Sequence, residues 1–100
     1  MHTYKVGDIL SSSWGYDQTN VTFYQVTRVT KASVELGTLR SQSTPEQGFM
    51  TAYKTPLPGE FTSDKRFMRR IGDGTGIRIS GNYEYAYPWD GKPERYSWYA

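Results

Sequence analysis

The chain has 100 residues, a formal net charge of +2 and no cysteine, with 12 Lys and Arg against 10 Asp and Glu. Without cysteine there are no disulfides and no thiolate chemistry, and the small net charge argues against a uniformly acidic or strongly basic surface. No apolar run approaches the roughly 20 residues of a membrane span, and the first ten residues do not resemble a signal peptide. One soluble domain over residues 1–100, in a reducing cytosolic compartment, is therefore expected.

The aromatic content is high and the aliphatic content is low. The sequence contains nine Tyr, four Phe and three Trp. Each aromatic side chain buries on the order of 150–250 Å² when enclosed, so an aromatic-rich core is expected. No helical period of useful length is present, whereas alternating apolar residues and glycine turns recur. These patterns predict an all-β domain.

Residues 4–10 predict a first strand with a kink at Gly7, and residues 11–20 (SSSWGYDQTN) predict a long polar loop. The loop contains Trp14 and Tyr16, together with Asp17 and Asn20, whose side chains can hydrogen-bond the local backbone. Two interpretations remain open. Trp14 plugs one end of the domain, or the rings form a rigid contact surface for a partner.

Residues 21–30 give the clearest strand, because they are β-branched or aromatic throughout much of their length. The TKAS sequence then predicts a turn, and residues 34–39 return as the hairpin partner. Residues 41–61 contain three prolines and two glycines. That composition predicts an ordered long loop, with a short strand over residues 49–53 at most.

Residues 65–71 and 76–80 predict a second hairpin around the GDGTG sequence. This region holds most of the excess positive charge. Its cations form the basic stripe, which consists of Lys65, Arg66, Arg69, Arg70 and Arg78. The stripe is either a solvated edge strand or a phosphate-binding surface.

Tyr83, Tyr85 and Tyr87 alternate along a further strand, which we call the tyrosine ladder. The shortage of aliphatic residues favours a core position for the ladder, although an exposed ladder would offer stacking rings. Trp89 lies at the Asp90-Gly91 turn, where an exposed contact position is expected. Residues 95–100 predict a last strand, whose free edge could pair two copies of the chain.

Catalytic residue types are few. The single histidine, His2, lies at the terminus, and Asp17, Asp73, Glu84 and Asp90 show no paired spacing that indicates a magnesium site. We therefore expect no enzyme activity, no metal site and no cofactor. The GDGTG sequence lacks the lysine and helix of a phosphate-binding loop.

The order of elements, a VGD strand, a polar-aromatic loop, a long strand and a tight hairpin, is similar to an SH3-like barrel of five to seven short antiparallel strands with a C-terminal β extension. The motifs SSWGYDQTN, FYQV, GFM, WDGKP and SWYA also resemble a family of small bacteriophage and mobile-element proteins. That resemblance covers residues 5–100 and supplies no catalytic residue. It implies a small protein that acts on the machinery of a bacterial host, in the host cytosol.

Two functional hypotheses follow. The first is a non-enzymatic module that docks on a host protein or nucleoprotein complex, for example as an anti-CRISPR inhibitor of host defence. Its expected contact residues are Trp14, Tyr16, Asp17, Asn20 and Trp89. The alternative is a nucleic-acid-binding module that uses the basic stripe for phosphates, with Tyr83 and Tyr85 as stacking rings. No membrane partner is expected.

Overall fold

The structure is a computed structural model that describes residues 4–14, 20–45, 51–71, 76–80 and 84–97. For Trp14, Asn20, Pro45, Thr51, Ser80 and residues 95–97 it describes the backbone alone. The elements are antiparallel strands, and the described residues contain no helix, so the all-β prediction is confirmed. The strands are β1 Ile9–Trp14, β2 Asn20–Val29, β3 Ser33–Pro45, β4 Thr51–Phe61, β5 Phe67–Arg70, β6 Ile77–Ser80, β7 Glu84–Pro88 and β8 Glu94–Ser97.

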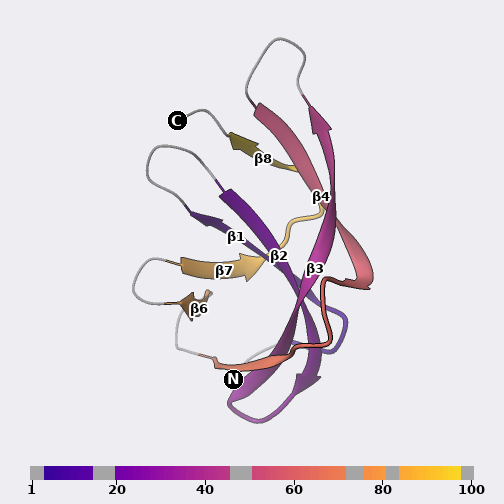
Figure 1. Ribbon diagram of the computed structural model, residues 1–100. Helices are drawn as coiled ribbons and strands as arrows, with labels where there is room; N and C mark the ends of the chain where they lie inside the picture. Colours follow the sequence, from indigo (N-terminus) through magenta and orange to yellow (C-terminus); the bar gives the residue numbers. More distant parts are fainter. Residues whose placement is uncertain (1–3, 15–19, 46–50, 72–75, 81–83, 98–100) are drawn as a thin grey trace.

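The strands form one sheet in the order β6-β7-β1-β2-β3-β4-β8, with β5 paired to β3 (Figure 1). The long strand β3 pairs with two different strands along its length. Its first residues, from Ser33 to Leu36, pair with β5, and its later residues, from Leu39 to Pro45, pair with β4. The sheet therefore divides into a six-strand unit, β6-β7-β1-β2-β3-β5, and a ribbon of β3, β4 and β8.

The six-strand unit curls until its end strands meet. The Arg69 Nε group on β5 donates a hydrogen bond to the Ile79 carbonyl on β6 at 2.9 Å. This contact gives the unit a barrel-like form, in agreement with the predicted fold class. Eight strands are present among the described residues, more than the five to seven expected, because the middle of the chain is also extended.

Strand β2 supplies both hydrophobic clusters, because its successive side chains point to opposite faces. Tyr24 and Val26 lie in the main cluster, and Val21 and Phe23 lie in the smaller one. The main cluster fills the six-strand unit and consists of Leu10, Tyr24, Val26, Val34, Leu36, Ile77, Ile79 and Ala86. The smaller cluster is Val21, Phe23 and Leu39, against which Ile9, Phe61 and Trp89 pack. Burial on both faces explains why β2 was the clearest strand in the sequence.

Three sequence expectations about elements are wrong. Residues 11–14 of the expected loop are instead the end of β1 and Asn20 is the start of β2, since the backbone of Trp14 pairs with that of Asn20, while residues 15–19 lie outside the described residues. The serine-rich segment is a strand because its backbone pairs with β2 on one side and with β7 on the other. Tertiary pairing thus overrides the weak strand preference of serine.

The second error concerns residues 41–45 and 51–61, which are the paired strands β3 and β4 in place of a loop, while residues 46–50 lie outside the described residues. Pro56 and Pro58 fit into β4 because β8 pairs only with its residues from Thr51 to Lys54. Beyond Lys54 this side of β4 is an edge in the described sheet, where a missing N–H group breaks no ladder.

The third error concerns the predicted hairpin of residues 65–71 and 76–80. Strand β5 pairs with β3, and β6 pairs with β7, so the two strands are not ladder partners. Strands β5 and β6 are short, and each pairs with a longer strand, β3 and β7 respectively. The Arg69 side chain on β5 nevertheless donates a hydrogen bond to the Ile79 carbonyl on β6.

Candidate functional site

The predicted contact residues differ in how far the structure describes them. Tyr16 and Asp17 lie outside the described residues, and Trp14 and Asn20 are register partners at the end of the β1–β2 hairpin. Trp89 is fully described. The geometry of a joint contact surface for the five residues therefore stays a prediction.

Trp89 is partly buried, so the expectation of an exposed contact at this position is wrong. Its ring lies edge-on to Phe23, with centroids 6.1 Å apart, and packs on the smaller cluster. The backbone N–H of Trp89 donates to the Ile9 carbonyl at 2.9 Å and continues the β7–β1 pairing, which directs the indole inward. The indole N–H donates to the Lys92 carbonyl at 2.7 Å and closes the turn.

The basic stripe does not form one set of available cations. The Arg66 guanidinium stacks over the Phe61 ring at 3.9 Å and donates to the Ser63 and Lys65 carbonyls. Arg69 stacks over Phe67 at 4.6 Å and is also bonded to the Ile79 carbonyl. Both side chains therefore stabilise the fold as well as contributing charge.

The remaining described cations of the stripe are exposed. Lys65 precedes β5, Arg70 ends it, and Arg78 lies on β6. Arg78 is the register partner of Tyr85, so the two side chains share the outer face of the β6–β7 pair. The structure thus brings together one cation and one ring of the nucleic-acid hypothesis, while Tyr83 lies outside the described residues.

The tyrosine ladder faces solvent, so the favoured core position is wrong for its described members. Tyr85 is 39% exposed and Tyr87 is 50% exposed. The inward positions of β7 are taken by Glu84 and Ala86, which are buried. Because neighbouring side chains of a strand alternate, the burial of Glu84 and Ala86 turns the tyrosines outward.

Glu84 is buried because two hydroxyl groups bind its carboxyl group. The Ser12 hydroxyl donates to Oε2 at 2.8 Å, and the Tyr24 hydroxyl donates to the same oxygen at 2.9 Å. These bonds tie β7 to β1 and β2 inside the six-strand unit. Burial and the hydrogen bond to Glu84 raise the pKa of Tyr24 well above its ordinary value.

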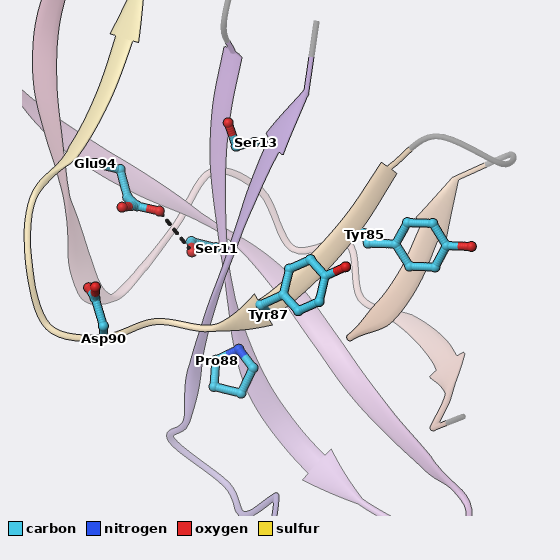
Figure 2. Close-up of a pocket in the computed structure, with 7 residues that line it drawn as sticks. All are labelled: Ser11, Ser13, Tyr85, Tyr87, Pro88, Asp90 and Glu94. Carbon is cyan, nitrogen blue, oxygen red and sulfur yellow. Dashed lines mark hydrogen bonds between the residues drawn. The ribbon is translucent and has the colours of Figure 1, made fainter. Parts of the chain in front are cut away.

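An open groove of about 240 Å³ lies on the outer face of β7 and β1 (Figure 2). Ser11 is the register partner of Tyr87, so these side chains share the sheet face that forms the floor. The turn after β7 and the start of β8 supply the acidic side. The lining residues are Ser11, Ser13, Tyr85, Tyr87, Pro88, Asp90 and Glu94.

Two carboxylates border this groove. Glu94 Oε1 accepts a hydrogen bond from the Ser11 hydroxyl at 3.2 Å, a contact drawn in Figure 2. Asp90 Oδ1 accepts one from the Lys92 backbone N–H at 2.9 Å, which holds the turn. Each acid therefore accepts a hydrogen bond from a polar neighbour.

A glycine fixes the ring of Tyr87. A Cβ atom at Gly76 would lie 2.6 Å from Tyr87 Cε1 and 2.9 Å from Cζ, distances that real side chains do not tolerate. The ring therefore packs against bare backbone at the last glycine of the GDGTG sequence. This contact gives that glycine a role in positioning a groove residue.

The carboxylates considered for a metal site are not assembled in the described region. Glu84 lies in the interior with Ser12 and Tyr24, and Asp90 lies at the groove, while Asp17 and Asp73 lie outside the described residues. Within residues 4–14, 20–45, 51–71, 76–80 and 84–97, no three His, Cys, Asp or Glu side chains lie close enough to hold a metal ion.

Sequence reasoning missed Ser11, Ser13, Pro88 and Glu94 as groove residues. Their only sequence signal was the alternation that places Tyr85 and Tyr87 on one face, which requires neighbours on the flanking strand. The pairing of β1 with β7 joins residues more than 70 positions apart, and the sequence does not reveal it.

In the described part of the chain no helix has the length and apolar character needed to cross a membrane. Comparison of the chain with models of protein families, with curated proteins and with solved structures finds no match.

Proposed function

We propose that the chain is a non-enzymatic binding module of a bacteriophage or mobile element, with an SH3-like barrel, that docks on a protein of its bacterial host. The observation that carries the proposal is the pair of exposed tyrosines on β7, which face an open groove. Tyrosine is enriched at interfaces because it combines a large apolar area with few rotatable bonds.

The setting of the two rings supports a binding role. They stand on a strand that pairs on both sides, with β1 and with β6. Tyr87 is also packed against Gly76. Rings that are ordered before binding lose little conformational entropy in the complex, which favours affinity. Inhibition of a host defence complex, as in the anti-CRISPR hypothesis, is one consequence that such docking would have.

The test compares capture of host proteins by three forms of the tagged chain in bacterial lysate treated with nuclease. We expect Tyr85→Ser with Tyr87→Ser to lower the yield of a specific host protein at least about tenfold, since an interface tyrosine commonly contributes more than 1 kcal/mol. The matched control is Tyr53→Ser on β4, because Tyr53 has the same exposed fraction, 39%, as Tyr85. Equal capture by all three folded forms would disprove the proposal.

A second candidate function is nucleic-acid binding, which is favoured by the shared face of Arg78 and Tyr85 and by the exposed Lys65 and Arg70. It predicts quenching of tryptophan fluorescence by single-stranded DNA or RNA, with an affinity that falls steeply between about 50 and 200 mM salt. The involvement of Arg66 and Arg69 in intramolecular contacts leaves fewer donors for phosphates and argues against it.

A further inference from the structure

The groove on β7 and β1 has an acidic lining. Its described lining residues include Asp90 and Glu94 and no lysine or arginine, whereas the whole chain carries a net charge of +2. The two carboxylates line the same groove as two exposed tyrosines, Tyr85 and Tyr87. The groove thus combines negative charge with aromatic surface.

Within the described part of the chain, no ion pair joins a lysine or arginine to either groove carboxylate. The ion pair recorded there joins Arg28 to Glu35, at 3.9 Å. Lys54 is the register partner of Glu94, but its ammonium donates to the Val21 carbonyl at 3.2 Å and does not line the groove. Asp90 and Glu94 accept hydrogen bonds only from the Lys92 N–H group and the Ser11 hydroxyl in this region.

Carboxylates and tyrosine faces attract the same kind of ligand. A carboxylate binds an ammonium or guanidinium group, and the electron-rich face of a phenol ring attracts the same cation. The chain contains a cation–ring contact at another place, where the Arg66 guanidinium lies 3.9 Å from the Phe61 ring centre. The groove volume of about 240 Å³ is below the roughly 300–1,000 Å³ typical of small-molecule sites, and suits one long side chain.

Resting on the docking function proposed above, we infer that this groove receives a lysine or arginine side chain from a basic segment of the partner protein. Asp90 and Glu94 bind the cationic group, while Tyr85 and Tyr87 cover its aliphatic stem. Ser11 orients Glu94 through the 3.2 Å hydrogen bond. The inference names the chemistry of the partner surface, which the docking function alone leaves open.

Charge also argues against nucleic acid as the occupant of this groove. A nucleic-acid strand would bring phosphates toward Asp90 and Glu94, which is repulsive. A second copy of the chain also carries exposed cations, such as Lys65 and Arg70, so the oligomeric state is one outcome of the test below.

The test uses two-dimensional NMR of the isotopically labelled full chain, titrated with a short Gly-Ser peptide that carries one central arginine. A second peptide carries citrulline, which has the same shape without the charge. We expect the arginine peptide to shift the backbone amides of Ser11, Ser13, Tyr85 and Tyr87, and the citrulline peptide to leave them unchanged. Asp90→Asn with Glu94→Gln should weaken binding about tenfold, because each of the two exposed ion pairs is expected to contribute roughly threefold to the affinity.

Glu60→Gln with Asp64→Asn is the matched control, because it removes two exposed carboxylates outside the groove and should leave the affinity unchanged. Absence of shifts at the groove amides, or equal binding of citrulline, would overturn the inference. Shifts of the same amides on addition of an oligonucleotide would also overturn it. So would a dimer that forms with rising protein concentration, shifts these amides and no longer forms in the Asp90→Asn, Glu94→Gln variant.

The capture experiment distinguishes failure of the cationic-ligand inference from failure of the docking function. If capture of the host protein depends on Tyr85 and Tyr87 but not on Asp90 and Glu94, docking stands and the cationic ligand is wrong. If capture depends on neither pair, the docking function fails as well.

Discussion

Removing the Tyr24 hydroxyl tests whether the buried carboxyl group of Glu84 organises the fold. In the Tyr24→Phe variant, Glu84 Oε2 loses the bond of 2.9 Å and retains the Ser12 bond of 2.8 Å. Both partners are buried, and a hydrogen bond to a charged group contributes about 1.5–3 kcal/mol to stability. For a domain of this size, a loss of about 2 kcal/mol lowers Tm by roughly 10 °C.

The assay is urea unfolding followed by tryptophan fluorescence and circular dichroism. Tyr53→Phe, at a position 39% exposed, is the control and should change the free energy of unfolding by less than about 0.5 kcal/mol. Ser12→Ala combined with Tyr24→Phe should cost at least about 0.5 kcal/mol more than the sum of the single changes, because it removes both donors from one oxygen. A Tyr24→Phe variant as stable as wild type would refute this account of Glu84.

Three further outcomes are expected. The raised pKa of Tyr24 means that the folded chain keeps a proton which the unfolded chain releases near its ordinary value of 10.0, so stability should fall as pH rises above about 10. Tyr24→Phe should flatten that slope by up to about 1.4 kcal/mol per pH unit in urea unfolding between pH 9 and 11, and an unchanged slope would contradict the assignment. Gly37→Ala would place Cβ 2.6 Å from Phe61 Cδ1 and should cost about 1–3 kcal/mol in thermal unfolding, whereas a neutral effect would show that the ring moves freely. Arg69→Met should lower stability by about 1 kcal/mol through loss of the bond to Ile79 and speed hydrogen exchange in β6, and unchanged exchange would mean that this bond does not hold β5 to β6.

The sequence predicted strands best where both faces of a strand are buried. Val21, Phe23, Tyr24 and Val26 all lie in hydrophobic clusters, so the local pattern and the tertiary environment agree along β2. The all-β class followed from the same alternation. These are local signals, and the β2–β3 hairpin needs only a short turn between its strands.

Long-range pairing produced the errors. Serine residues in β1 and prolines in β4 have weak strand preferences, and only their partners in β2, β7 and β3 make them strand residues. The tyrosine ladder was placed in the core because aliphatic residues are scarce. That argument assumed that Glu84 faces solvent, and it failed because Ser12 and Tyr24 bind the carboxyl group in the interior.

The site was predictable only in part for the same reason. Trp89 was selected as a candidate contact residue because it lies at a turn, and Tyr85 was selected only for the nucleic-acid alternative, as a stacking ring. The acids of the groove had no such signal, since Asp90 and Glu94 come beside Tyr87 only when the turn folds back over β1. Proximity between the residues of this site depends on the pairing of β1 with β7 and of β4 with β8.

Trp89 still bears on the groove, although as a positioning residue and not as an exposed contact. Its ring is anchored against Phe23, and its indole N–H holds the Lys92 carbonyl at 2.7 Å. Asp90 binds the N–H of the same Lys92 at 2.9 Å, so two bonds fix the turn from opposite sides of one residue. Because the turn is anchored on a hydrophobic cluster, its carboxylate keeps its place beside Tyr87 before any partner arrives. A groove whose residues are held in place before binding loses little conformational entropy when it binds a cation.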